Sequence, residues 1–411
     1  MTAVGAGVPG LLQGSDRQPP APSVTGGAGR PIGTIPFLGV VIVSLGGPLA
    51  LAALYVPTIL DDASAAAGLV SIAGAVVFGI PLLLWLRYAR DVAGPGGLYG
   101  FVYAAAGRRT ALLQAGLWIA SYALYLIYTT ASIVYDVLPA VTPAVKPYQS
   151  LLEVAIPVAL AAVMLAGRTA TLAVLGGMAI GQLVLVGALA AVTIGHDAPT
   201  GAFALRAPST GLTSATGQIA LLYVCGSLPL FLGGEVRRPA STVRRGMVGG
   251  TVLVAAGVTA AVFPLAQNPA FTRAAIPGMS IAQVFSGRPL ALAIGIGVAV
   301  SVAGVMLVEY VALSRVLHAI TAKPLRTVIG VLAAVLVLTA PVTLINPERF
   351  YNDLLKPSLV ALWLSQLVVF VVYPRFAARH HRLRVTDLLL TVGACAFAVY
   401  GIYATLHHAG T

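Results

Sequence analysis

Long apolar runs constrain this chain more than any other feature. Segments of about 18 or more mostly apolar residues recur from end to end, and each could cross roughly 30 Å of hydrocarbon as a helix. Of the 411 residues, 58% are hydrophobic and only 9% are charged. A soluble domain could not hide that much apolar surface. The sequence therefore predicts an all-α integral membrane protein.

About eleven membrane-spanning helices are expected. Ahead of them, residues 1–34 are rich in Gly, Pro and Ala and lack periodicity, which indicates a disordered tail. The spans are expected at residues 35–60, 65–87, 110–138, 150–167, 169–195, 213–234, 247–266, 289–318, 326–345, 352–374 and 384–406. Both cysteines, Cys225 and Cys395, lie within apolar runs, so a disulfide framework is not expected.

The charges of the loops test this arrangement. With the N-terminus in the cytoplasm, about three quarters of the 24 Lys and Arg fall on the cytoplasmic side, as the positive-inside rule requires. The basic tracts "VRRPASTVRR" and "RFAARHHRLR" are then cytoplasmic anchors rather than nucleic-acid sites. We expect a multi-pass protein of the cytoplasmic membrane whose C-terminus is extracytoplasmic.

Two spans carry helix-breaking residues at matching places. "SLGGPLA" (44–50) lies in the middle of the first span and "CGSLPLF" (225–231) in the middle of the sixth. Corresponding spans keep a near-constant offset of about 180 residues, which indicates two five-helix halves, 35–195 and 213–374. Because five is odd, the second half inserts inverted relative to the first. Residues 384–411 add one further helix and the C-terminus.

Breaking a helix inside a bilayer is costly, because each freed backbone group facing lipid costs several kcal/mol. Such breaks are tolerated where they line a cavity or meet a polar ligand. Matched breaks in inverted repeats therefore indicate a secondary transporter with its site at the bilayer midplane. The alternative is that these glycines only allow close helix packing and that Pro48 and Pro229 form simple kinks.

Three motifs resemble those of a known family. "GPGGLYGFVYAAAGRR" (94–109), "GGEVRRPASTVRRG" (233–246) and "SRVLHAIT" (314–321) are similar to signatures at the ends of helices 2, 6 and 8 in amino acid–polyamine–organocation (APC) superfamily permeases. The resemblance spans about residues 35–374 and implies a leucine-transporter-like core of ten helices. It also implies import or exchange of amino acids or related amines, usually driven by protons or sodium.

The resemblance implies a set of substrate-binding residues. Backbone groups of the two breaks would contribute most, and Tyr223 would act as an aromatic gate over the substrate. On the third span, a shared face at i, i+4 and i+7 would turn toward the substrate, although tyrosines also favour interfaces and ordinary packing. The expected residues are Ser44, Leu45, Gly46, Gly47, Ser121, Tyr125, Tyr128, Tyr223, Cys225, Gly226, Ser227 and Leu228.

One acidic residue lies deep in an apolar span. Glu309 stands within the eighth span, where a charge costs at least about 3 kcal/mol. Intramembrane acids usually face an aqueous cavity, so Glu309 is expected to carry a proton or to contact a substrate amine. The alternative is an ion pair with Arg315, which the i, i+6 spacing disfavours, or with another arginine near the cytoplasmic face. Glu235, at the end of the sixth span, is expected to pair with Arg237 or Arg238.

Departures from the family pattern leave substrate and coupling ion open. The first break reads Gly46-Gly47-Pro48 where many members have Gly-Ser-Gly, and the fifth span lacks the lysine that replaces sodium in some relatives. The eighth span offers only Ser301, and more distantly Ser314, as hydroxyls for sodium. Proton coupling or exchange is therefore favoured over sodium.

The sequence thus predicts a secondary active transporter of an amino acid or amine, working by alternating access, with no cofactor and no metal. The alternative is a membrane enzyme acting on a lipid-linked substrate. Such an enzyme needs clustered carboxylates or a nucleophile with its base, and neither is recognisable in the sequence. A channel or structural subunit would not account for the paired breaks. A member of the same fold that has lost transport stays open, as does the oligomeric state.

Overall fold

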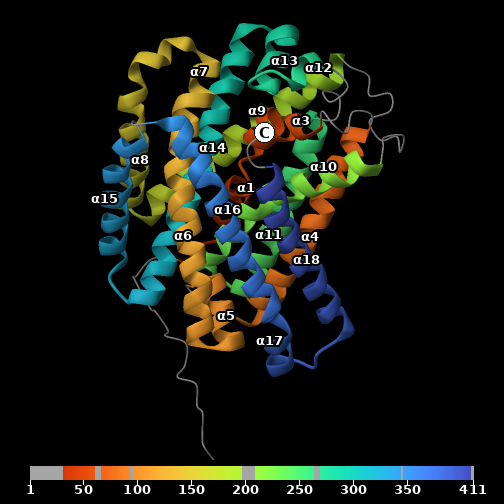
Figure 1. Ribbon diagram of the computed structural model, residues 1–411, viewed down its shortest axis with the longest axis vertical. Helices are drawn as coiled ribbons and strands as arrows, with labels where there is room; N and C mark the ends of the chain where they lie inside the picture. Colours follow the sequence, from red (N-terminus) through yellow and green to blue (C-terminus); the bar gives the residue numbers. More distant parts are fainter. Residues whose placement is uncertain are drawn as a thin grey trace, which may run out of the picture. The chain divides into compact units, whose positions relative to one another are not determined.

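Helices make up nearly all of the described chain (Figure 1). The computed structural model describes residues 31–60, 66–92, 94, 96–196, 209–262, 269–343 and 346–408. The helices are α1 (Thr34–Ser44), α2 (Pro48–Ala50), η1 (Leu51–Tyr55), α3 (Val56–Leu60), α4 (Ala67–Asp91), α5 (Leu98–Ala106), α6 (Arg108–Ser132), η3 (Ile133–Val137), α7 (Leu138–Val141), η4 (Pro143–Tyr148), α8 (Gln149–Leu165), α9 (Arg168–His196), α10 (Ser209–Leu222), η5 (Tyr223–Glu235), α11 (Pro239–Val262), α12 (Pro269–Thr272), α13 (Pro277–Ser286), α14 (Arg288–Thr321), α15 (Leu325–Thr343), α16 (Pro347–Val371), α17 (Tyr373–His380) and α18 (Val385–His408).

The helices agree with the predicted spans. Within the described residues, nine helical stretches are long and apolar enough to cross a bilayer, and they coincide with nine of the predictions. The remaining two spans, predicted at 247–266 and 326–345, fall on α11 and α15, which have 24 and 19 residues. At 1.5 Å per residue these helices are roughly 36 and 29 Å long. Each of the eleven predicted spans therefore has a helix.

The last residues of the predicted tail, 1–34, contact the folded part of the chain. Residues 1–30 lie outside the described residues. Ile32 is buried, its N–H donates to the Glu235 carbonyl at 2.9 Å, and its own carbonyl accepts from the Arg237 N–H at 2.8 Å. The residues just before α1 are thus joined to the end of η5 by backbone hydrogen bonds.

The first span is broken where the sequence predicts. α1 ends at Ser44, Gly46 and Gly47 adopt φ angles of +75° and +69°, and α2 starts at Pro48. Residues with a Cβ rarely adopt such angles, whereas glycine does so at little cost. The chain then winds as a π-helix in η1 before the span ends in α3.

The sixth span is interrupted by a change of helix type. α10 ends at Leu222, and the 13 residues of η5, with Pro229 among them, wind as a 3-10 helix. Three residues per turn lengthen the segment and weaken its hydrogen bonds compared with an α-helix. The interruption thus extends over the whole second part of this span and is not confined to the Gly-Ser-Leu-Pro step.

Two turns of matching geometry support the internal repeat. Short α5 meets long α6 at Gly107, with φ of +83° and ψ of −179°. Short α13 meets long α14 at Gly287, with φ of +83° and ψ of −178°. The two glycines are about 180 residues apart, which is the offset between the two interrupted spans. The repeat is therefore visible in backbone conformation as well as in the order of the helices.

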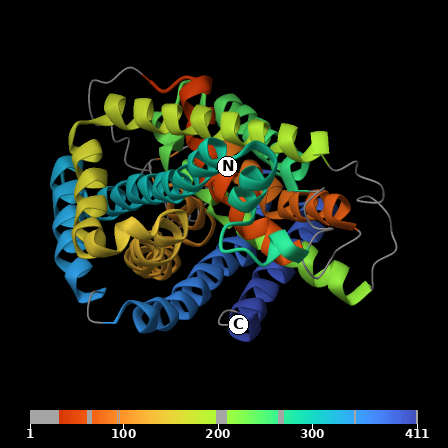
Figure 2. The same ribbon diagram turned by 90° about the horizontal axis from the view of Figure 1, so that it is seen from above.

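Helices from the two predicted halves, 35–195 and 213–374, pack against each other. α6 lies along α16, α4 along α11, and α8 along α15 (Figure 1). In Figure 2 the red ribbon of the first span is flanked by green and teal ribbons from the second half. The stretch with the largest buried share is in Thr34–Leu60, at 83%, followed by Leu212–Glu235 and Arg288–Thr321 at 72% each. The two interrupted spans and the one that holds Glu309 thus form the core.

Apolar side chains on the outer helices match a lipid environment. α9 exposes Ile180 and Val184, α15 exposes Leu338, and α18 exposes Leu389 and Val392. In water such surfaces would be costly, whereas hydrocarbon accepts them. The described chain is therefore a multi-pass membrane protein with its polar groups gathered inside.

Replacing Gly47 tests the first break. Alanine there must adopt a left-handed conformation, at a cost of roughly 1–2 kcal/mol. Its Cβ would also come 2.4 Å from Ser301 Oγ. We expect Gly47→Ala to lower the thermal midpoint of the purified protein by several degrees.

The matched control is Gly181→Ala in α9, where an added Cβ meets nothing within 4 Å. Its expected effect is neutral to stabilising, because alanine favours a helix interior by up to about 1 kcal/mol over glycine. Equal midpoints for the two variants would contradict the strained conformation at Gly47.

Candidate functional site

The two interruptions lie against each other. A Cβ at Gly226 would come 2.8 Å from Leu45 Cδ2, and a Cβ at Gly46 would come 3.0 Å from the Leu222 carbonyl oxygen. The two backbone segments predicted to bind substrate therefore meet in the core. They are Ser44, Leu45, Gly46 and Gly47 in the first span, and Cys225, Gly226, Ser227 and Leu228 in the sixth.

A serine and a glutamine support the first break from the side. Ser301 Oγ, on α14, accepts a hydrogen bond from the Ala50 N–H at 3.2 Å and donates one to Gln182 Oε1, on α9, at 2.7 Å. All of these groups are buried. The hydroxyl satisfies one of the N–H groups at the start of α2, which has no partner in its own helix. Gln182 Nε2 has no hydrogen-bond partner among the described residues.

Glu309 is fully buried on α14, and neither carboxyl oxygen has a hydrogen-bond partner among the described residues. The alternative pairing with Arg315 is not observed, because the Arg315 guanidinium lies against Glu235 instead. A buried polar group without a partner costs free energy, and a charged one costs far more. The fold therefore holds the Glu309 carboxyl in the core without a hydrogen-bond partner among the described residues.

Residues from α6 and η5 lie near Glu309. The Glu309 carboxyl interacts electrostatically with Tyr122, Tyr125 and Cys225. Tyr122 OH lies 3.9 Å from Cys225 Sγ and donates to it. Helices α6 and α14 and segment η5 thus bring a carboxyl, a thiol and two phenols into one buried cluster.

Tyr125 and Tyr128, predicted to share a face of the third span, are neighbours in the structure. The Tyr125 and Tyr128 rings are 4.9 Å apart, and Tyr125 is only partly buried although it lies beside Glu309. Ser121 is buried, and its carbonyl oxygen accepts from Ser358 Oγ at 2.9 Å, which ties α6 to α16. The side chain that contacts Cys225 is Tyr122, one position away from the predicted face. Its spacing of three from Tyr125 also puts both on one side of a helix.

Tyr223, the predicted gate, is the first residue of η5 and is fully buried. Its ring lies 5.5 Å from that of Phe78 on α4, and Gly226 is also beside Phe78. The Tyr223 hydroxyl has no hydrogen-bond partner among the described residues. The ring therefore packs on the side of the sixth span that faces α4, while its hydroxyl stays available.

Gln366 was not among the predicted residues. It lies on α16, is fully buried, and its Nε2 donates to Ser227 Oγ at 3.4 Å, while its Oε1 has no partner among the described residues. The only signal in the sequence is the polar pair Ser365-Gln366 within an apolar helix. Which face of that helix turns toward η5 depends on tertiary packing, so the sequence could not assign it.

An ion-pair network centred on Glu235 joins η5, α9 and α14. Glu235 pairs with Arg315 at 3.1 Å and with Arg168 at 3.4 Å, so the expected pairing with Arg237 or Arg238 is wrong. Those arginines are next to Glu235 in sequence, but the 3-10 winding of η5 ends at Glu235 and the chain turns away there. The network joins the ends of η5 and α14 to the start of α9, beside the Ile32 bridge.

The described residues contain no group of three or more His, Cys, Asp or Glu that could hold a metal ion. No family model matches the chain, and no curated protein matches it in sequence. The structure is similar to that of MhsT in complex with L-phenylalanine, with a TM-score of 0.60 over 90% of this chain and 97% of that one, at 15% identity.

This likeness confirms the predicted fold class. The chain has a leucine-transporter-like fold, and helices 1 and 6 are interrupted as that fold requires. At 15% identity the likeness concerns the fold alone. The resemblance to APC superfamily permeases stays a prediction.

The different surroundings of Glu309 and Glu235 can be tested through stability. Glu309→Gln removes a carboxyl that has no partner, so we expect its thermal midpoint to equal or exceed that of the wild type. Glu235→Gln leaves Arg315, whose side chain is only 6% exposed, without its counter-ion. Removing one partner of an ion pair whose other partner is buried is destabilising, so its midpoint should fall by several degrees.

Both variants replace Glu with Gln, so each serves as the control for the other. A Glu309→Gln variant that unfolds as early as Glu235→Gln would show that Glu309 has a structural partner.

Proposed function

We propose that this protein is a secondary active transporter that moves an amino acid or a related amine across the cytoplasmic membrane by alternating access. One observation carries the proposal: a fully buried carboxyl without a partner, Glu309, lies beside an interrupted helix in a leucine-transporter-like fold. A carboxyl in this position is suited to a substrate ammonium or to a proton, and intramembrane acids usually mark such pathways.

The residues around Glu309 support a small polar substrate. Its ammonium group would lie between Glu309 and the phenols of Tyr122 and Tyr125. A substrate carboxylate would lie near the breaks at Gly46 and Gly226, close to the N-terminal end of α2. Because MhsT was determined with L-phenylalanine, neutral amino acids are the first candidates.

The burial of the tyrosines near Glu309 supports one direction of opening. Tyr55 and Tyr125 keep part of their surface exposed, whereas Tyr122 is fully buried. The opposite side is closed by the ion pairs of Glu235. We infer that the substrate reaches Glu309 past Tyr55 and Tyr125 in this conformation, and leaves after the Glu235 pairs separate.

Proton coupling is favoured over sodium by the state of Ser301. A sodium site between the first and eighth spans would need hydroxyl and carbonyl oxygens free to coordinate the ion. Ser301 instead donates to Gln182 and accepts from Ala50. Glu309, by contrast, would be neutral when no cation lies beside it, because a partnerless buried charge is expensive. Protonation of Glu309 could then alternate with binding of the substrate amine.

Ligand-dependent thermal stabilisation tests the substrate class. A compound that binds only the folded protein raises its midpoint, with a gain of about 2.7 kcal/mol at 100 times its Kd. We expect a rise with one or more amino acids or amines from a panel of neutral, cationic and acidic compounds. Tyr125→Ala should lose that rise, while Gly181→Ala should keep it.

Uptake into proteoliposomes tests transport itself, with the stabilising compound as labelled substrate. If the compound binds and no uptake or exchange occurs, the protein is a binding member of this fold and the transport proposal is wrong. If no amino acid or amine binds, the proposed substrate class is wrong.

The Glu309→Gln variant tests coupling. Glutamine cannot exchange a proton or pair with an ammonium as a carboxylate does, so we expect uptake driven by a pH gradient to fall by at least about tenfold. The stability expected for this variant makes a loss of uptake interpretable. Unchanged uptake and unchanged dependence on pH would remove Glu309 from the mechanism.

A further inference from the structure

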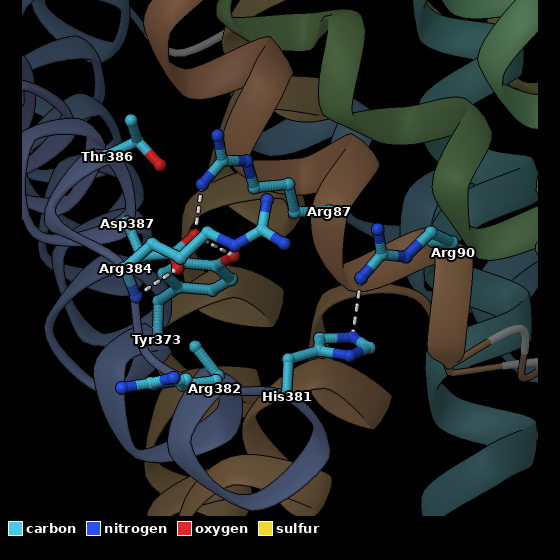
Figure 3. Close-up of a pocket in the computed structure, with 9 residues that line it drawn as sticks. Arg87, Arg90, Tyr373, His381, Arg382, Arg384, Thr386 and Asp387 are labelled. Atoms are coloured by element: carbon cyan, nitrogen blue, oxygen red, sulfur yellow. Dashed lines mark hydrogen bonds and ion pairs between the residues drawn. The ribbon is translucent and has the colours of Figure 1, made fainter.

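A polar pocket lies where α4, α17 and α18 meet, lined by none of the residues at the two breaks (Figure 3). Its cavity volume is about 260 Å³. Its floor and walls come from the end of α4, from α17, and from the turn between α17 and α18. The lining residues are Arg87, Arg90, Tyr373, Ala377, His381, Arg382, Arg384, Thr386 and Asp387.

The pocket is strongly positive, since four arginines and one histidine face a single aspartate. Asp387 is already engaged: it pairs with Arg87, accepts from Tyr373 OH at 3.2 Å, and accepts from the Arg384 backbone N–H at 2.9 Å. These contacts fix the geometry of the wall.

Two of the arginines have no such engagement. No hydrogen bond or ion pair joins the guanidinium groups of Arg382 and Arg384 to the part of the chain that the structure describes. Arg90 and His381 lie together on the other wall, with Arg90 Nη2 2.5 Å from His381 Nε2, which is also 2.7 Å from Asp91. The pocket therefore holds uncompensated positive charge on a fixed frame.

The pocket borders apolar surface on two flanking helices. Leu83 lies one turn before Arg87 on α4 and is 51% exposed. On α18, Leu388 and Leu389 follow Asp387 directly and are 44% and 66% exposed. Residues four apart on a helix share a face, so the apolar strip of α4 leads into the pocket. A soluble anion would use only the arginines, whereas a molecule with a charged head and apolar chains would use both.

We propose that this pocket binds the phosphate group of an anionic phospholipid, whose acyl chains lie along the exposed apolar side chains of α4 and α18. Guanidinium groups match phosphate oxygens in a two-pronged geometry, and basic pockets at the ends of membrane helices bind anionic head groups. Arg382 and Arg384 supply the free donors, Thr386 adds a hydroxyl, and Asp387 holds the frame. Bound lipid would connect the additional helix α18 to α4 of the core.

Lipid binding to the full-length protein tests the proposal. The probes are phosphatidylglycerol and phosphatidylcholine with the same acyl chains, counted on the purified protein by native mass spectrometry. We expect the wild type to prefer phosphatidylglycerol. The double variant Arg382→Gln, Arg384→Gln should lower that binding by about tenfold.

The matched control is Arg244→Gln, Arg245→Gln, which removes two exposed arginines from the start of α11, outside the pocket. It should keep the preference. An equal loss of phosphatidylglycerol binding in both double variants would show a general attraction to basic surface, and the proposal that the pocket is the binding site would be wrong.

Competition separates lipid from free phosphate. Inorganic phosphate and glycerol phosphate, at the head-group concentration of the lipid, should leave bound phosphatidylglycerol in place because they lack apolar chains. If either compound displaces the lipid at that concentration, the site binds a soluble anion and the proposal of a lipid site is wrong. If the wild type shows no preference for phosphatidylglycerol over phosphatidylcholine, the proposal is wrong whatever the variants show.

Discussion

Backbone hydrogen bonding in a medium without water is the constraint on which this structure depends. Each helix must satisfy its own N–H and carbonyl groups, so a break in a span needs partners from its neighbours. At Gly46 and Gly47 the α1 helix stops, and Ser301 on α14 supplies an acceptor for the Ala50 N–H. Gln182 on α9 in turn accepts from Ser301. These hydrogen bonds thus join three helices from both halves of the repeat and stabilise the interruption.

The second interruption solves the same problem differently. η5 keeps hydrogen bonding by winding as a 3-10 helix, and its glycine at 226 lets Leu45 and Phe78 approach closely. Because the two interruptions are in contact, a displacement of one span would also displace residues of the other. The Glu235 ion pairs and the Ile32 bridge hold the far ends of the same elements. The two interrupted spans are therefore in contact at their breaks and are also joined at one end.

The unsatisfied groups are as informative as the satisfied ones. Most buried polar groups in folded proteins have partners, yet the Glu309 carboxyl, Gln182 Nε2 and Gln366 Oε1 have none among the described residues. Gln366 contacts Ser227 in η5, Gln182 contacts Ser301 beside the first break, and Glu309 lies next to Cys225. These three side chains, from α9, α14 and α16, therefore lie around the interrupted segments.

The sequence by itself determined the membrane class, the positions of the spans, the first break and the buried acid. Each depends on residue type alone: apolar runs mark spans, Gly-Gly-Pro cannot continue a helix, and no other acid lies so deep in an apolar run. Tertiary structure decided the rest. Glu235 pairs with Arg168 and Arg315, which are distant in sequence. Tyr122 contacts Cys225 and Gln366 contacts Ser227 because of how α6 and α16 are rotated relative to η5. The rotation of a helix that is apolar on every side is set by packing with its neighbours, and a single sequence carries little record of it.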